Sequence, residues 1–220
     1  FENCVWGYRY REAEMKDYRF EIITGPMSCG KTEELLRRIK RAVIANKNVK
    51  VFFPEIDKRV SGDYIRSRNG IARDAIRVHS AKEILAYTRD ADIVAIDELQ
   101  FFDRHIVEVI RTLTKQGKKV IGAGLDLDFK EEPFGHMPEL LCYANKVDKL
   151  TAICMKCGSE YGLRTQRLIN GEPADVSSPQ IMIGGDETYE ARCLDCYELK
   201  KTKEDKKLFV LSRAKIEHNV

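Results

Sequence analysis

Residues 25–32 read GPMSCGKT and could bind the phosphates of a nucleoside triphosphate. Two glycines bracket four residues, and a lysine and a threonine follow at once, which is the spacing of a phosphate-binding loop. Backbone N–H groups would converge on phosphate oxygens, Lys31 would reach the terminal phosphates, and Thr32 would offer its hydroxyl to magnesium. The alternative is a glycine turn that happens to precede a lysine. The candidate phosphate-binding residues are Gly25, Met27, Ser28, Cys29, Gly30, Lys31 and Thr32.

Asp97 and Glu98 follow the apolar run 93–96 and could hold a metal ion and move a proton. A buried strand that delivers a carboxylate beside the phosphates is typical of phosphate-loop proteins, so we expect Asp97 to hold magnesium. Adjacent side chains on an extended segment face opposite ways, which leaves Glu98 to accept a proton from the attacking nucleophile. That nucleophile is water in an ATPase and a hydroxyl in a kinase. An ordinary acidic strand end is the alternative.

Four of the seven cysteines form two CxxC pairs, Cys154 with Cys157 and Cys193 with Cys196. In a reducing compartment such pairs usually bind metal or react before they form disulfides. If the two turns meet, their sulfurs make a closed tetrahedral site for a structural zinc ion. A pair of redox dithiols, or four unrelated buried cysteines, are the alternatives.

The elements that must position these residues alternate between strand and helix up to residue 147. Short apolar runs between helical patterns suit a parallel sheet buried on both faces, with nucleotide at the carboxyl ends of the strands. We therefore predict an α/β fold, a P-loop NTPase-like parallel sheet flanked by helices. The predicted strands are 20–23, 49–53, 93–96 and 120–123, and the helices are 33–46, one capped by Ser80 with Glu83 in a capping box, and one from Asp103 to Gly117.

The pattern changes near residue 148, where the CxxC turns and a loop-like stretch over 170–180 begin to dominate. This part predicts a small Cys4 zinc-ribbon domain. The predicted divisions are an N-terminal extension over 1–17, a nucleotide-binding α/β domain over 18–147, the zinc-binding domain over 148–198 and a C-terminal tail over 199–220. Met15, just before the first strand, is a candidate natural start.

The composition argues against nucleic acid and membranes as partners. The 220 residues include 38 Lys and Arg against 35 Asp and Glu, and a net charge of +3 is too small to favour nucleic acid or an anionic membrane. No apolar run approaches the ~20 residues that cross a bilayer, and the N-terminus lacks the pattern of a secretion signal. We expect a cytoplasmic protein.

Several segments carry a family resemblance when they are taken in order over residues 20–198. They read GPMSCGKTEELLRR, IDELQFF, GLDLDFKEEPFG, CMKC and CLDC, with IGGDETYEARC leading into the last pair. This series resembles the zinc-bearing, tetrameric type of cytosolic thymidine kinase. The phosphate loop alone is generic, whereas IDELQFF and GLDLDFKEEPFG are specific to that family.

The resemblance implies that Glu98 is the general base that takes the proton of the thymidine 5′-hydroxyl. It implies that Lys31, Thr32 and Asp97 handle ATP and magnesium. Asp57 and Arg59 match a segment near the transferred phosphate. The positions that match residues enclosing the base are Met27, Phe101, Leu125, Phe129 and Phe134. The family's loop between the cysteine pairs folds over the nucleoside like a lasso, and Thr165, Met182, Ile183 and Tyr189 match positions there.

The implied activity is transfer of the ATP γ-phosphoryl group to thymidine, and also to deoxyuridine, in deoxynucleotide salvage. The implied partners are thymidine triphosphate as feedback inhibitor and three further copies in a homotetramer. Arg68 stands where many members have histidine. One rival is a nucleoside monophosphate kinase with a zinc-stapled lid, in which Arg59, Arg66 and Arg68 would bind the acceptor phosphate. The other is a nucleic-acid-dependent ATPase.

Overall fold

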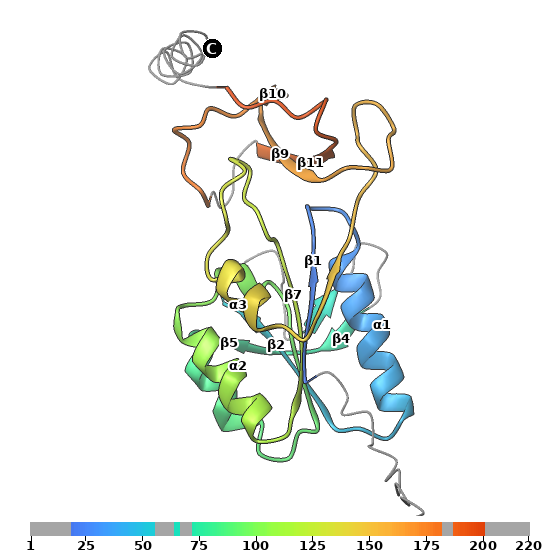
Figure 1. Cartoon of the computed structure of the whole chain (residues 1–220), viewed down its shortest axis with the longest axis vertical. Coiled ribbons are helices and arrows are strands. Elements are labelled where there is room, and N and C mark those ends of the chain that lie inside the picture. The colour runs from blue at the N-terminus through green and yellow to red at the C-terminus, as the bar shows by residue number, and fades with distance from the viewer. Residues whose placement is uncertain (1–18, 56–63, 67–71, 182–186, 201–220) are drawn as a thin grey trace, which may run out of the picture.

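The computed structural model describes residues 19–55, 64–66, 72–181 and 187–200 (Figure 1). Six strands form a sheet in the order β5-β2-β6-β7-β1-β8, and every pairing in it is parallel. The predicted α/β fold with a parallel sheet is therefore confirmed. The strands are β1 (Phe20–Thr24), β2 (Val49–Pro54), β5 (Ile76–Val78), β6 (Ile93–Ile96), β7 (Lys119–Gly124) and β8 (Lys146–Lys149).

Helices cover both faces of this sheet because alternate strand residues point to opposite faces. Ile22 belongs to a core cluster with residues of the 3₁₀ helix η1, of α2 and of α3, whereas Ile23 belongs to a second cluster with residues of α1. Figure 1 shows α1 on one side of the sheet and α2 with α3 on the other. The helices are α1 (Lys31–Ile44), η1 (Ala81–Tyr87), η2 (Leu99–Phe101), α2 (His105–Lys115) and α3 (Met137–Tyr143).

A second, antiparallel sheet follows in the order β10-β9-β11. It is built from β9 (Arg164–Ile169), β10 (Glu172–Pro173) and β11 (Glu187–Arg192), and the CxxC turns lie before β9 and after β11. Figure 1 shows it beyond the end of β1 from which the phosphate loop leaves. A separate two-stranded pair joins β3 (Tyr64–Arg66) to β4 (Ala72–Asp74).

The capping box predicted at Ser80 is wrong. The Glu83 carboxylate accepts the backbone N–H of His79 at 3.2 Å, and the segment 81–87 is a 3₁₀ helix without a side-chain cap. Asp103 was predicted to cap the next helix. Its carboxylate does accept the backbone N–H of His105, the first residue of α2, at 2.8 Å.

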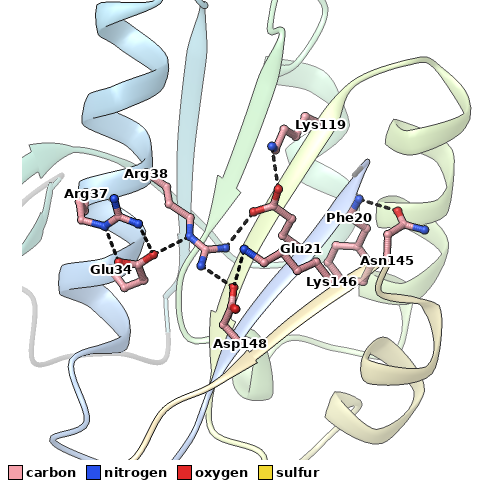
Figure 2. Close-up of polar contacts among 9 residues, drawn as sticks. All are labelled: Phe20, Glu21, Glu34, Arg37, Arg38, Lys119, Asn145, Lys146 and Asp148. Carbon is pink, nitrogen blue, oxygen red and sulfur yellow. Dashed lines mark hydrogen bonds and ion pairs between the residues drawn. The ribbon is translucent and has the colours of Figure 1, made fainter. Parts of the chain in front are cut away.

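An ion network ties α1 to the sheet (Figure 2). Arg38 on α1 bonds Glu21 of β1 at 2.8 Å and Asp148 of β8 at 2.5 Å. Glu34, one turn earlier on the helix, accepts from Arg38 at 2.8 Å, and Lys119 of β7 bonds Glu21 at 2.7 Å. The helix that begins at the phosphate loop is thus joined to three strands.

No helix within the described ranges is long and apolar enough to cross a membrane.

Candidate functional site

The loop between β1 and α1 has the backbone geometry of an anion cradle. Gly25 has a φ of +136°, and a Cβ on it would lie 2.4 Å from the Leu150 carbonyl oxygen, so only glycine fits. Ser28 and Gly30 take left-handed conformations, with φ values of 64° and 85°. Because α1 begins at the next residue, Lys31, the loop lies at the positive end of the helix dipole.

Lys31 reaches across this loop. Its ammonium donates to the Gly25 carbonyl at 3.1 Å and to the Pro26 carbonyl at 2.6 Å, and it lies 3.7 Å from the Cys29 sulfur. A bound phosphate would offer the ammonium charged acceptors in place of two neutral carbonyls. Burial raises the pKa of the Cys29 thiol and outweighs the opposing effect of Lys31, so the thiol form of Cys29 is favoured at neutral pH.

Asp97 lies next to Thr32 at the end of β6. Its Oδ2 accepts the Thr32 hydroxyl at 3.1 Å, and its Oδ1 accepts the Glu98 backbone N–H at 2.9 Å. The side chain is buried, and burial together with the nearby Glu98 carboxylate raises the pKa of Asp97 to about 7. A hydroxyl and a carboxylate oxygen at this separation can share one hard cation such as magnesium.

The sequence pattern predicted that the extended strand continues through Glu98, and the structure shows that it does not. Strand β6 ends at Ile96, and Glu98 has a φ of 51°, in the left-handed region, where it begins η2. A non-glycine residue in that region is uncommon and is concentrated at functional sites. A left-handed turn, rather than continued strand alternation, therefore sets the backbone that carries Glu98.

Gln100 contacts Glu98 and was not singled out from the sequence. Its Nε2 donates to Glu98 Oε2 at 2.5 Å, and its Oε1 accepts the Leu125 backbone N–H at 3.0 Å. Gly124 leaves room for the amide, because a Cβ there would lie 2.8 Å from Gln100 Oε1. The only sequence signal was its position two residues after Glu98 in IDELQFF, and its burial depends on a distant segment.

The four paired cysteines converge. One sulfur from each of Cys154, Cys157, Cys193 and Cys196 lies within 4.8 Å of all the others, and two of them, on Cys157 and Cys193, are 3.7 Å apart. A tetrahedron with Zn–S bonds of about 2.3 Å has edges of about 3.8 Å. The set therefore has the donors and spacing of a closed zinc site, and the alternative of four unrelated cysteines is wrong.

Apolar residues expected around a base gather beyond the carboxyl ends of the strands. The rings of Phe101 and Phe134 meet edge to face with centroids 5.5 Å apart, whereas Phe102 belongs to the hydrophobic core. Leu125 is held by Gln100 through its backbone N–H. Two rings, of Phe129 and Tyr189, lie near the guanidinium of Arg167 on β9.

The phosphate loop contacts the second sheet directly. The backbone N–H of Met27 donates to the hydroxyl of Thr165 on β9 at 3.0 Å, and Thr165 is buried. Residues from the two parts of the chain therefore meet at the phosphate loop.

A family model described as thymidine kinase matches residues 18–197 of this sequence. The chain belongs to the thymidine kinase family. The phosphate loop, the acidic pair, the apolar residues and the cysteine cluster all lie inside the matched range. The resemblance stated from the sequence is therefore confirmed at the level of the thymidine kinase family.

Two solved structures are similar to parts of this thymidine kinase family member. Domain III of the replication initiation protein DnaA from Thermotoga maritima is 15% identical over 62% of this chain and 56% of that one, with a TM-score of 0.38. AMPPCP-bound DnaA from Aquifex aeolicus is 13% identical over 63% of this chain and 43% of that one, with a TM-score of 0.39. The match spans about half the length of these chains. Neither likeness bears on the activity of this protein.

Some residues that the thymidine kinase resemblance assigned fall outside the described ranges. They are Asp57, Arg59, Met182 and Ile183, together with the variable position Arg68. The N-terminal extension over 1–17 lies outside them as well.

Proposed function

We propose that this protein transfers the γ-phosphoryl group of ATP to the 5′-hydroxyl of thymidine, and of deoxyuridine, to supply thymidylate in pyrimidine deoxynucleotide salvage. The observation that carries the proposal is the thymidine kinase family match over residues 18–197. Contacts within the site support the proposed ATP binding and proton transfer, as described next.

ATP would bind with its phosphates in the loop, where Lys31 exchanges the carbonyls of Gly25 and Pro26 for phosphate oxygens. Thr32 and Asp97 would hold magnesium, because their oxygens already lie 3.1 Å apart. Bound magnesium would neutralise charge on the β- and γ-phosphates. Further contacts to ATP are proposed for Met27, Ser28, Cys29, Gly30, Asp57 and Arg59.

Glu98 would take the proton of the attacking 5′-hydroxyl. Gln100 fixes one oxygen of this carboxylate, and Glu98 lies in the left-handed turn that follows β6. The two carboxylates would have different tasks, since Asp97 would bind the metal and Glu98 would take the proton. Catalysis by this site would rest on positioning and charge neutralisation more than on covalent chemistry.

The nucleoside would be enclosed by flat and apolar side chains from both sheets. Aromatic faces bury a pyrimidine with little loss of side-chain freedom. The proposed nucleoside-binding residues are Met27, Phe101, Leu125, Phe129, Phe134, Thr165, Met182, Ile183 and Tyr189.

A structural zinc ion in the Cys4 cluster would fix the base of the loop that covers the nucleoside. Cys154, Cys157, Cys193 and Cys196 would supply a full shell of thiolates, which leaves no position for water or substrate. We further propose a homotetramer in the cytoplasm that is inhibited by thymidine triphosphate, as in the family type that the sequence resembles.

A substrate panel tests this function. The purified protein with ATP and magnesium is offered thymidine, deoxyuridine, deoxycytidine, thymidylate and single-stranded DNA, and we expect phosphorylation of thymidine and deoxyuridine. Phosphorylation of thymidylate but not thymidine would establish a nucleoside monophosphate kinase instead. DNA-stimulated ATP hydrolysis without nucleoside phosphorylation would establish a nucleic-acid-dependent ATPase.

The matched control for this panel is Glu98→Gln. It should lower turnover by about 10²- to 10⁴-fold, because the proton acceptor is lost, while ATP still binds. Near-normal turnover in this variant would remove Glu98 as the base without affecting the choice of substrate.

A further inference from the structure

Arg167 is a fully buried cation in the middle strand of the second sheet. Its side chain is 1% exposed, and within the described ranges no carboxylate forms an ion pair with it. Burying a guanidinium without a counter-ion is unfavourable unless other groups replace its hydration. The groups that contact the Arg167 guanidinium therefore indicate the role of this residue.

Two aromatic rings and two carbonyls surround the guanidinium. Its central carbon lies 3.8 Å from the centroid of the Phe129 ring and 5.1 Å from that of Tyr189. The two terminal nitrogens donate to the backbone carbonyls of Pro179 at 2.5 Å and Gln180 at 2.6 Å. A planar, delocalised cation can stack on rings and donate in its own plane at once, which a lysine ammonium cannot do.

These partners come from three separate segments of the chain. Phe129 lies in the loop after β7, residues 179–180 lie in the stretch between β10 and β11, and Tyr189 lies on β11 directly opposite Arg167. The guanidinium is therefore a shared contact that fixes the three segments relative to one another.

A second contact joins the loop after β7 to the stretch between β10 and β11. Gln180 Nε2 donates to Asp128 Oδ2 at 2.9 Å, next to Phe129 in sequence. Asp128 is buried, and its other oxygen accepts the backbone N–H groups of Lys130 at 2.8 Å and Glu132 at 3.0 Å. Hydrogen bonds within the loop that carries Phe129 therefore order this loop independently of its contact with residues 179–180.

We propose that Arg167 is a positioning residue for the nucleoside. It holds the rings of Phe129 and Tyr189 and the backbone of residues 179–180 in the arrangement that receives the base, before the nucleoside arrives. This role rests on the proposed function, which assigns both rings to the nucleoside. Among the described residues, no hydrogen bond or ion pair joins the Arg167 side chain to the phosphate loop or the acidic pair. Arg167 therefore acts on nucleoside affinity and leaves ATP binding and phosphoryl transfer largely unchanged.

Steady-state kinetics with Arg167→Lys and Arg167→Met tests the role. Both variants should raise KM for thymidine by about tenfold or more, since ordering a loop on binding consumes affinity, and should change KM for ATP and kcat less than about threefold. The matched control is Arg164→Lys on the same strand, where the arginine pairs with Glu131 near the surface, and its kinetics should stay those of the unmodified protein. A fall in kcat with KM for thymidine unchanged would overturn the proposal.

Backbone ¹⁵N relaxation on the unmodified protein keeps the proposal testable if the variants do not fold. The N–H groups of Gln180 and Ile181 should have order parameters of about 0.8 in the nucleoside-free protein, as in rigid backbone, and adding thymidine should leave them unchanged. Order parameters below about 0.6 that rise only when thymidine is added would show that Arg167 does not preorganise this segment. If the protein phosphorylates no nucleoside, the proposed function fails, whereas the relaxation experiment still reports on the order of residues 180–181 beside Arg167.

Discussion

Single residues at this site carry opposing electrostatic demands, and Asp97 shows this most clearly. It must be charged to bind a cation, yet burial and the neighbouring Glu98 raise its pKa from 3.8 to about 7. Two hydrogen-bond donors, the Thr32 hydroxyl and the Glu98 N–H, compensate only in part. Without a cation the site therefore stores a free-energy penalty at neutral and alkaline pH, which metal binding can relieve.

The raised pKa of Asp97 makes stability fall as pH rises. Between 3.8 and about 7 the folded protein holds a proton that the unfolded chain releases, so the free energy of unfolding decreases across this window. Asp97→Asn removes the titration and should stabilise the nucleotide-free protein at pH 8 by on the order of 1–3 kcal/mol. Thermal unfolding measured from pH 5 to 8 in magnesium-free buffer checks this. The buffer contains no chelator, because a chelator would remove metal from the cysteine cluster.

Asp103→Asn provides a control with the opposite sign. Burial disfavours the charged form of Asp103, but the N–H groups of Ala81 and His105 outweigh it and lower its pKa. A lowered pKa stabilises the fold above the unfolded value of 3.8, and that contribution is lost as pH falls through the folded value. Asp103→Asn should therefore destabilise the protein at pH 7. Superimposable pH–stability curves for Asp97→Asn and the unmodified protein would contradict the account of Asp97.

Gln100 gives a second residue-scale prediction. Gln100→Met removes the donor to Glu98 and the acceptor for the Leu125 N–H, so the carboxylate loses its fixed position. We expect kcat for thymidine to fall by about 10- to 100-fold with ATP affinity retained, because misplacing a catalytic group is costly. Gln100→Glu keeps an acceptor for Leu125, but it replaces the donor to Glu98 with a carboxylate oxygen that repels it, so kcat should fall here as well. Equal, near-normal kcat in both variants would show that Glu98 needs no such support.

Elements differ in how well the sequence predicts them. Strands β1, β2, β6 and β7 are buried apolar runs, and all four were predicted. Strand β8 reads KVDK and β5 reads IRV; they lie at the two edges of the sheet, where polar residues are tolerated, and neither was predicted. Edge strands are defined by their pairing partner more than by their own composition.

The same limit applies to the site. Spacing within one segment predicted the phosphate loop and the cysteine pairs, because each depends on a local turn. The roles of Gln100 and Arg167 depend on contacts with Leu125 and with residues 179–180, which lie far away in the chain. Local patterns do not encode such pairings. The left-handed turn at Glu98 was missed because strand alternation was extended two residues beyond the end of β6.

The cysteine cluster makes an element-scale prediction. Cys157→Ser removes one thiolate from the set, and we expect loss of zinc and of order in the β10-β9-β11 sheet, since metal-binding free energy is folding free energy here. Zinc analysis and proteolysis of the purified variant check this. Cys142→Ser is the matched control, because Cys142 lies exposed on α3 outside the cluster. A zinc-free Cys157→Ser protein with full activity would rule out a structural metal.

At the scale of the whole molecule, the ion network around Arg38 holds the phosphate-loop helix against the sheet (Figure 2). Arg38→Met leaves the buried Glu21 with one fewer partner and should lower the free energy of unfolding by about 1–3 kcal/mol. Arg37→Met is the control: its side chain is 58% exposed and, among the described residues, forms an ion pair only with Glu34, so we expect a clearly smaller loss of stability. Urea denaturation measures both. Equal effects would show that the network adds nothing beyond a surface pair.

The hydrogen bond from the Met27 N–H to the Thr165 hydroxyl would make the two proposed substrate sites thermodynamically dependent. The donor belongs to the loop that would cradle ATP, and the acceptor belongs to the strand that carries Arg167. A substrate that shifted this contact would change the affinity for the other substrate, and linkage requires the effect to be the same in both directions. A single threonine hydroxyl would then let the protein respond to the presence of both substrates together.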